Sequence, residues 1–155
     1  MKVYLAITQL LDQHNIKYEV KAHAPTPTSE DSAQARNEPL KIGAKAIVAK
    51  ADSGFIMLVL PGDRKIDSKA VKELLKARDF RFATREELAS LTSLEPGAVP
   101  PFGNLFNLPT LMDKAFLEEE FIAFNAGELT KSIKMKVKDY RALAAPRVEE
   151  FSYKK

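Results

Sequence analysis

The sequence predicts a single α+β domain in which a curled, mostly antiparallel mixed sheet is surrounded by short helices. The chain has 155 residues, close to the usual size of one domain, and its 45% apolar and 29% charged residues are typical of globular proteins. Its β-rich runs are short and outnumber the helical segments, and two of them are joined by a hairpin signal. We therefore expect residues 1–155 to share one core.

The N-terminal part of the chain predicts a helix, a strand and a second helix. Apolar residues at helical spacing over 2–14 indicate an amphipathic helix, and a short strand follows at 16–20. Two prolines in the stretch 23–28 exclude regular helix there. Thr28 can then cap a short helix that runs to Arg36, with acidic residues in its first turn.

The central part predicts a β-hairpin. Residues 44–51 and 55–60 are β-rich, and a short Gly-containing loop at 52–54 joins them. We expect this hairpin to form the centre of the sheet. Three elements follow: a helix that Asp67 or Ser68 caps and that runs through Ala77, a strand at 80–83, and a short helix that begins with the capping box Thr84–Glu87.

A stretch rich in glycine and proline, residues 93–109, is too long for an ordinary connection. Its apolar side chains, among them Val99, Phe102, Leu105 and Phe106, predict an ordered loop. The remaining elements are strands at 111–113, 120–125 and 132–137, and a closing helix from Asp139 through Ala144 that Pro146 stops.

Composition excludes several kinds of protein. The chain has no cysteine, so it forms no disulfide and has no thiolate nucleophile. The longest unbroken apolar run, Phe55–Leu60, is far too short to span a bilayer. The first 13 residues lack the features of a cleaved signal. We therefore expect a cytoplasmic protein.

Charge is unevenly distributed along the chain. Residues 64–85 contain eight basic and three acidic residues, and residues 131–155 contain the same numbers. Residues 86–130 between them contain one basic and eight acidic residues. The two basic blocks could converge on a face that contacts phosphates. Alternatively, Lys69, Lys72 and Lys76 form a solvated helix face.

The familiar catalytic motifs are missing. His14 and His23 are the only histidines, and neither has a partner at metal-ligand spacing. The sequence has no P-loop, no dinucleotide fingerprint and no serine nucleophile elbow. We expect no metal and no cofactor. Lys45 stands out, because its neighbours predict a strand that enters the core, where an ammonium needs an anionic or carbonyl-rich partner unless it reaches out from a strand edge.

Several ordered segments, from His23 to Pro146, resemble the YbaK family of aminoacyl-tRNA deacylases, which is related to the editing domain inserted in bacterial prolyl-tRNA synthetases. The segments that carry the resemblance are His23-x-Pro25-x-x-Thr28-x-Glu30-x-x-Ala33, Ala44-Lys45, the stretch Leu60 to Asp67, the Gly-x-x-x-Pro loop Gly97 to Gly103, Leu108-Pro109 with Asp113, Phe124-Asn125-Ala126-Gly127, Ser132-Ile133-x-Met135 and Asp139-Tyr140. Relatives often carry a histidine shortly after the Asn-Ala-Gly turn, where this chain has 128–130 Glu-Leu-Thr.

The resemblance implies hydrolysis of the ester between an amino acid and the terminal ribose of tRNA. The substrate supplies a vicinal hydroxyl, so the protein needs to hold the ester against preorganised donors and admit a water. The resemblance makes Lys45 a positioning cation and assigns the oxyanion donors to the loop from Gly97 to Gly103. The substrate-binding residues it implies are His23, Thr28, Pro101, Phe102, Asp113, Asn125, Ala126 and Gly127. The structural alternatives are that His23 and Thr28 stabilise a turn, that Asp113 caps a strand end, and that residues 125–127 form only a turn.

The chain contains no synthetase or anticodon-binding domain, so we expect a free-standing enzyme that edits mischarged tRNA in trans. Its expected partners are the acceptor end of aminoacyl-tRNA and, as a second candidate, a synthetase. We expect the 97–103 loop and the 125–127 turn to be opposite walls of a pocket for a small amino acid such as alanine or serine. Two alternatives are a non-catalytic binder of aminoacyl-tRNA or nucleotides and a protein-interaction module that uses the acidic block 86–130.

Overall fold

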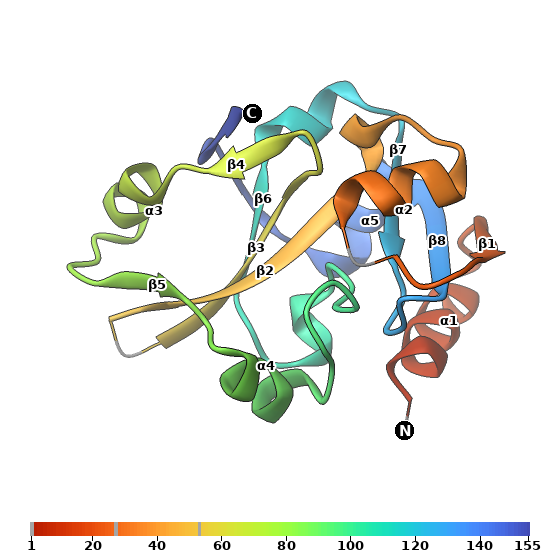
Figure 1. The fold of residues 1–155 in the computed structure, drawn as a ribbon, viewed down its shortest axis with the longest axis horizontal. Helices are drawn as coiled ribbons and strands as arrows, with labels where there is room; N and C mark the ends of the chain where they lie inside the picture. Colours follow the sequence, from red (N-terminus) through yellow and green to blue (C-terminus); the bar gives the residue numbers. More distant parts are fainter. Residues whose placement is uncertain (1, 27, 53) are drawn as a thin grey trace.

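The computed structural model describes residues 2–26, 28–52 and 54–155, which form five α-helices, three 3-10 helices and ten strands (Figure 1). The helices are α1 (Val3–Gln13), α2 (Ser29–Arg36), α3 (Ser68–Leu75), α4 (Arg85–Thr92) and α5 (Val137–Ala144), and the 3-10 helices are η1 (Leu40–Ile42), η2 (Gly103–Leu105) and η3 (Lys114–Glu118). The strands are β1 (Tyr18–Ala22), β2 (Ala44–Ala51), β3 (Gly54–Pro61), β4 (Arg64–Ile66), β5 (Phe80–Phe82), β6 (Thr110–Asp113), β7 (Phe121–Asn125), β8 (Lys131–Lys136), β9 (Arg147–Glu149) and β10 (Ser152–Lys154).

The central sheet has five strands in the order β5-β2-β3-β6-β9. β2 and β3 form the predicted hairpin, in antiparallel register from Ala44 opposite Pro61 to Ala51 opposite Gly54. β3 pairs with β6, and β6 with β9, in parallel. The hairpin is thus the centre of a mixed sheet, as expected, although Ser53 in its loop lies outside the described residues.

A second, three-stranded sheet has the order β1-β8-β7 and is antiparallel throughout. An isolated parallel bridge between Gly43 and Ala123 joins it to the central sheet, immediately before β2 begins. The α+β class is therefore confirmed, with a refinement: the curled sheet consists of separate sheets that meet at this bridge. A third sheet pairs β4 with β10.

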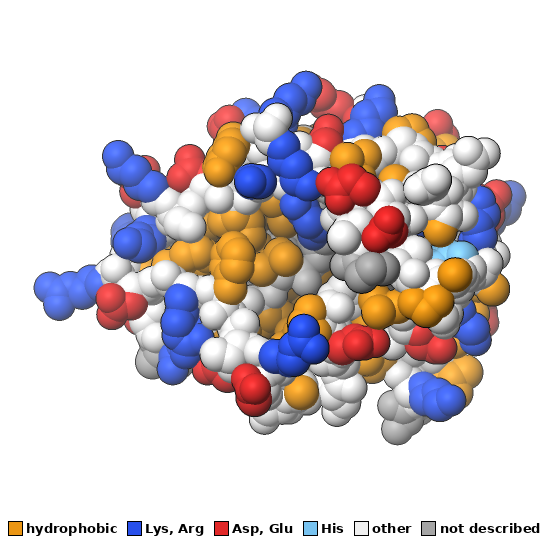
Figure 2. Space-filling view, in the orientation of Figure 1, with side chains coloured by type: hydrophobic (Ala, Val, Ile, Leu, Met, Phe, Trp, Pro, Cys, Tyr) orange, Lys and Arg blue, Asp and Glu red, His pale blue; other side chains and the backbone are white. Residues whose placement is uncertain are grey.

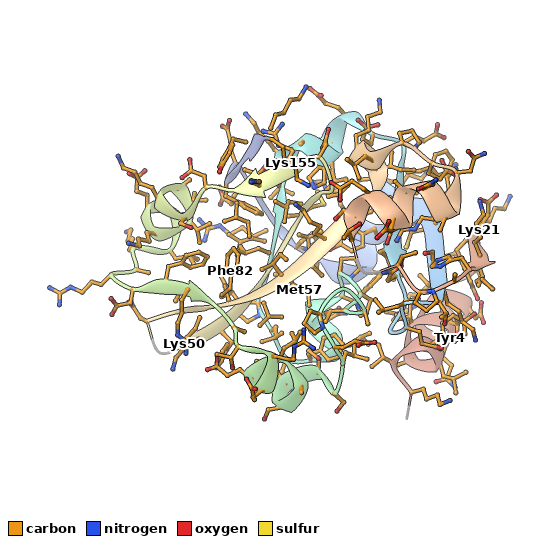
Figure 3. All side chains as sticks on the ribbon, viewed as in Figure 1. Tyr4, Lys21, Lys50, Met57, Phe82 and Lys155 are labelled. Atoms are coloured by element: carbon orange, nitrogen blue, oxygen red, sulfur yellow. The ribbon has the colours of Figure 1, made fainter. Side chains whose placement is uncertain are left out.

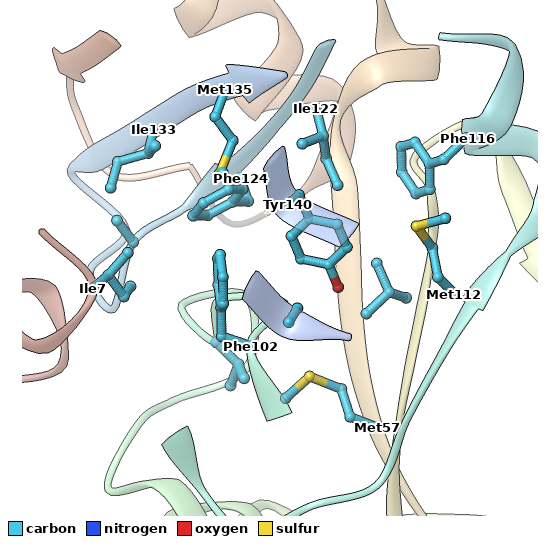
Figure 4. Packing of buried hydrophobic residues seen from close by; sticks show 14 of the residues in the cluster. Ile7, Met57, Phe102, Met112, Phe116, Ile122, Phe124, Ile133, Met135 and Tyr140 are labelled. Atoms are coloured by element: carbon cyan, nitrogen blue, oxygen red, sulfur yellow. The ribbon is translucent and has the colours of Figure 1, made fainter. Parts of the chain in front are cut away.

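Two apolar clusters pack on the two faces of the central sheet. The larger contains an aromatic group in which the Phe102 ring lies edge-on to Phe124 and Tyr140, with centroids 5.7 and 5.2 Å apart (Figure 4). The Tyr140 hydroxyl donates a hydrogen bond to the carbonyl oxygen of Pro101. The smaller cluster packs α3 and the C-terminal segment on the other face, through Val71 and Phe151. Both cores hold β2 and β3 rigidly in place.

Most expected elements appear within one to three residues of their predicted bounds, and the caps are confirmed. The Thr28 side chain accepts a hydrogen bond from the Asp31 N–H, and Thr84 and Glu87 form the reciprocal capping box. The strands β4, β9 and β10 were not expected, because each has only three residues and carries charged side chains. The proline-rich stretch 23–28 is non-helical where it is described, and Pro27 lies outside the described residues. No helix in the described ranges is long and apolar enough to cross a membrane.

Candidate active site

A pocket of about 220 Å³ lies between α2 and the first half of β2, and we call it the Lys45 pocket. It opens on the face shown in Figure 2, where basic side chains gather beside an apolar surface. Ser29, Ser32 and Arg36 line it from one face of α2, because they are three and four residues apart. The lining residues are Thr26, Thr28, Ser29, Ser32, Arg36, Gly43, Ala44, Lys45, Ala46, Ile47, Gly97 and Val99.

Lys45 lies near the rim of this pocket and is half-buried. Its ammonium donates a hydrogen bond to the backbone carbonyl of Arg64. Burial lowers the pKa of the Lys45 ammonium, and Lys155 lowers it further, whereas Glu30 and Asp63 act in the opposite direction. Lys45 therefore has a carbonyl partner, as its position in the strand required, and its charge is partly desolvated at the pocket.

The rim of the pocket carries further charges. The Lys155 ammonium lies 3.0 Å from the Glu30 carboxylate at the start of α2. β10 pairs with β4 so that Lys154 is opposite Arg64 and Tyr153 opposite Lys65. Figure 3 shows Lys155 beside β4. Parts of the two basic blocks of the sequence thus converge next to Lys45.

One edge of β2 is open at the pocket. The carbonyl of Val48 accepts a hydrogen bond from the Ala83 N–H, so Val48 directs its backbone groups towards β5. Ala46, two residues earlier, directs its N–H to the same edge. β5 pairs only with Ala49 to Ala51, so no strand in the described chain covers Ala46. Among the described residues, the Ala46 N–H therefore has no hydrogen-bond partner, and Ala46 lines the pocket.

Gly97 supplies a second backbone donor. Its φ of +88° is in the left-handed region that favours glycine, and it lines the Lys45 pocket. Its carbonyl accepts a hydrogen bond of 2.9 Å from the Asn125 side chain, which fixes the peptide. Within the described ranges, its N–H makes no hydrogen bond to another protein atom. Ala46 and Gly97, which carry these two N–H groups, both line the pocket.

A buried polar network supports the inner wall. Arg36, only 5% exposed, donates from Nε to Ser132 Oγ at 2.9 Å and from Nη2 to Asn125 Oδ1 at 3.1 Å. Ser132 Oγ also lies 3.1 Å from Asn125 Oδ1 and 2.7 Å from His23 Nε2. His23 therefore supports the inner wall of the Lys45 pocket through Ser132, and it is not among the residues that line the pocket.

Arg36 was not singled out from the sequence. Burial lowers its pKa to about 10, and Glu38 acts in the opposite direction, so the guanidinium remains charged at neutral pH. The available signal was its place on the face of α2 that also buries Ser32 and Ala33. A cation on the buried face of a short helix needs polar partners, and the side chains of Asn125 and Ser132 provide them.

Several predicted site residues lie outside the pocket. Phe102 is part of the aromatic core, and the buried Pro101 accepts the Tyr140 hydrogen bond through its carbonyl. A Cβ on Gly103 would meet Thr110 Oγ1 at 1.9 Å, so this glycine allows close packing and is not an oxyanion donor at the pocket. Asp113 is 1% exposed and accepts hydrogen bonds from the N–H groups of Ala115 and Phe151, which makes it a cap of the strand end.

The expectation that the 97–103 loop and the 125–127 turn form opposite pocket walls is wrong. Ala126 is fully buried, and the Gly127 N–H donates to the carbonyl of Ala98 in that loop. A Cβ on Gly127 would stand 3.0 Å from the Val3 side chain at the start of α1, away from the Lys45 pocket. The pocket therefore brings together Lys45, Thr28 and Gly97, with Asn125 and His23 behind its wall.

Comparisons with known proteins find relatives over most of this chain. The family model described as aminoacyl-tRNA editing domain matches residues 23–143. An Escherichia coli protein named multifunctional Ser/Thr-tRNA deacylase ProXp-y is 30% identical over 147 residues, which are 92% of this chain and 88% of that protein. A proline–tRNA ligase from Sulfurihydrogenibium is 36% identical over 110 residues, which are 70% of this chain and 19% of the ligase.

The fold also matches solved structures. A crystal structure of a candidate trans-editing enzyme for prolyl-tRNA synthetase has a TM-score of 0.85 to this chain, at 22% identity, and the match covers 99% of this chain and 98% of that one. The matched segment 23–143 contains every predicted site residue and both backbone donors of the pocket. The chain therefore belongs to the aminoacyl-tRNA editing domain family, the family that its ordered motifs resemble.

Proposed function

We propose that this protein, an aminoacyl-tRNA deacylase of the editing-domain family, holds the aminoacylated 3′ end of a tRNA in the Lys45 pocket and hydrolyses the ester there. The observation that carries the proposal is the composition of the pocket. A partly desolvated ammonium and two residues with unpaired backbone N–H groups line a cavity whose described lining residues include no histidine, carboxylate or cysteine.

This composition favours a reaction in which the substrate provides its own base. The lining hydroxyls of Thr26, Thr28, Ser29 and Ser32 have no imidazole or carboxylate beside them within the described lining to activate them as nucleophiles. The terminal ribose of tRNA has a hydroxyl next to the ester. Its oxygen can accept a hydrogen bond from a water that attacks the carbonyl carbon, and the proton that the water loses can pass through this hydroxyl to the ribose oxygen that leaves when the ester bond breaks. The protein then contributes position and charge stabilisation.

The donors have distinct roles in this proposal. The N–H groups of Ala46 and Gly97 stabilise the negative charge that develops on the carbonyl oxygen, and they need no reorganisation because the strand and the Asn125 hydrogen bond fix them. The Lys45 ammonium binds an oxygen of the ribose or its phosphate and places the ester beside those donors. It acts as a cation and not as a base.

A neighbouring hollow of about 190 Å³ offers room for the base of the terminal nucleotide. It shares Ala46, Ile47 and Gly97 with the Lys45 pocket, and its other lining residues include Phe82 and Arg85. The Phe82 side chain is 53% exposed, which leaves a ring face for a base to stack on. The β4–β10 strands, with Lys65, Lys154 and the exposed Tyr153, then lie where the phosphates of the tRNA end would run.

We further propose that the enzyme acts in trans on small aminoacyl groups with a polar side chain. The Escherichia coli relative, of which this chain covers 88%, is named for serine and threonine. The similarity to segments of proline–tRNA ligases makes such a synthetase a candidate partner.

The experiment that tests the proposed chemistry compares two forms of one tRNA, both charged with threonine on the 3′ oxygen, one ending in adenosine and the other in 2′-deoxyadenosine. Single-turnover release of threonine should occur from the first and fall at least about 100-fold for the second, since a vicinal hydroxyl that assists the reaction contributes on the scale of general acid–base catalysis. Filter binding of both forms is the control for affinity. Equal rates would show that the protein itself supplies the base or nucleophile.

A further inference from the structure

We propose that Arg36 is the specificity-determining residue of the Lys45 pocket, and that its guanidinium selects aminoacyl groups with a small hydroxyl-bearing side chain over apolar groups of the same size. This inference rests on the proposed deacylase function. It assigns the discrimination to a residue that the family motifs of the sequence did not include.

The first step concerns the geometry of the guanidinium. Nε and Nη2 donate to Ser132 Oγ and Asn125 Oδ1, which hold the group in one orientation. None of the hydrogen bonds among the described residues involves Nη1. A Cβ on Gly43 would stand 3.2 Å from Nη1, so this nitrogen lies beside Gly43, which lines the pocket. The residue is 5% exposed, and Nη1 brings two N–H donors next to this pocket-lining glycine.

The second step concerns the charge. No ion pair among the described residues involves Arg36, and the carboxylate that most affects it, Glu38, pairs with Lys134 at 2.8 Å. Within the described chain, the hydrogen-bond partners of this buried guanidinium are thus the neutral oxygens of Ser132 and Asn125. An acceptor oxygen in the pocket would complete that solvation, whereas a methyl group in the same place would leave the N–H groups without a partner.

The third step concerns which part of the substrate reaches Arg36. The residue lies seven positions after Ser29 on the same helix, a rise of about 10 Å, and the charged rim with Lys45, Lys155 and Glu30 lies at the Ser29 end. The phosphates of a tRNA remain at that exposed rim. The group that enters the buried end is the amino-acid side chain, and the small cavity limits it to a few atoms.

Threonine and valine provide the decisive comparison, because they differ by a hydroxyl in place of a methyl group. An apolar pocket separates such isosteres poorly, whereas a pocket that donates a hydrogen bond to the hydroxyl rejects the analogue that lacks it. One hydrogen bond to a charged donor predicts a preference of about 10- to 100-fold for threonyl-tRNA in kcat/KM.

The experiment measures deacylation of one tRNA charged with threonine or with valine, by the wild type and three variants. Gly43→Ala places a methyl group against Nη1, and the φ of −71° at this position accommodates alanine. Arg36→Lys keeps the charge but cannot hold both network oxygens and reach the pocket. Gly54→Ala at the hairpin end is the matched control, since its added Cβ meets no described atom closer than 4.0 Å.

We expect the wild type and Gly54→Ala to prefer threonyl-tRNA by about 10- to 100-fold, and both Gly43→Ala and Arg36→Lys to bring the ratio close to one, mainly by slowing threonine release. Thermal unfolding checks that the variants are folded. If a variant does not fold, the ratio of threonyl-tRNA to valyl-tRNA deacylation by the wild type still tests the inference. Equal wild-type rates, or an equal loss for both substrates in folded Gly43→Ala, would overturn the role of Arg36 while leaving the deacylase intact. Absence of release from both substrates and from seryl- and alanyl-tRNA would instead refute the proposed function.

Discussion

Replacing Lys45 by methionine separates the role of its charge from that of its position in the fold. The variant keeps an unbranched side chain of similar length in β2 and removes the ammonium. If this ammonium holds the ribose or phosphate against the backbone donors, kcat/KM should fall about 100-fold, which corresponds to a loss of about 3 kcal/mol of transition-state binding.

The stability of the same variant should change little. The substitution removes one hydrogen bond to the Arg64 carbonyl, worth about 1 kcal/mol, but it also removes the cost of a partly desolvated charge. For a chain of this size, we therefore expect the melting temperature to move by less than about 4 °C. Lys50→Met is the matched control, because Lys50 lies on the same strand outside the pocket (Figure 3).

The assay is single-turnover release of amino acid from mischarged tRNA, followed from neutral to alkaline pH with the enzyme-free rate subtracted. Since burial lowers the pKa of Lys45, activity that requires its charge should decline before the pH reaches 10.5, the ordinary value for lysine. In the same pH interval the folded state binds fewer protons than the unfolded state, because the folded pKa of Lys45 is the lower one. The free energy of unfolding of the wild type should therefore rise with pH there. Lys45→Arg should move the decline in activity to higher pH. Near-normal turnover in folded Lys45→Met would refute the role of the ammonium.

Three further predictions concern the tRNA end and the turn. The affinity for tRNA should fall with salt at a log–log slope of about −0.7 to −0.9 per phosphate contacted, and charge reversal at Lys65 and Lys154 should flatten that slope, whereas Lys17→Glu, between α1 and β1, should not. Phe82→Ala should raise KM about tenfold at constant kcat, because base stacking on an aromatic ring contributes about 1–3 kcal/mol; an unchanged KM would exclude the stacking role. Gly127→Ala should lower the free energy of unfolding by about 1–3 kcal/mol and leave the threonine-to-valine ratio unchanged, because its φ of +86° and the Val3 contact strain any side chain; altered selectivity in a stable variant would contradict this placement.

Local signals predicted most of the fold. The hairpin of β2 and β3 follows from β-rich runs around a short loop, and the helices after Thr28 and Thr84 follow from side chains that cap their own first turns. These features depend on residues close together in the sequence. The three-residue strands, such as β4 and β10, exist because a distant partner strand pairs with them, so the sequence gives no local sign of them.

The candidate site was only partly predictable for the same reason. Lys45 was noticeable because a charge in an apolar strand needs a partner. The open edge beside Ala46 arises because β5 stops pairing at Ala49, which depends on tertiary structure. Gly97 and Gly103 look alike in the sequence, yet one lines the pocket and the other allows a close approach to Thr110. Spacing along the chain does not show whether a turn faces a pocket or packs away from it. Gly127 packs against Val3 at the start of α1, away from the Lys45 pocket.

The Lys45 pocket is proposed to be the place where aminoacyl-tRNA is hydrolysed. The most direct test is amino-acid release from a panel of tRNAs charged with serine, threonine, alanine, valine and phenylalanine, with the protein at catalytic concentration and no synthetase present. We expect multiple turnovers on the small hydroxyl-bearing residues, slower release of alanine and valine, and no release of phenylalanine. Tight binding of these tRNAs without release of any amino acid would contradict this proposal and would make the protein a non-catalytic binder of the tRNA end.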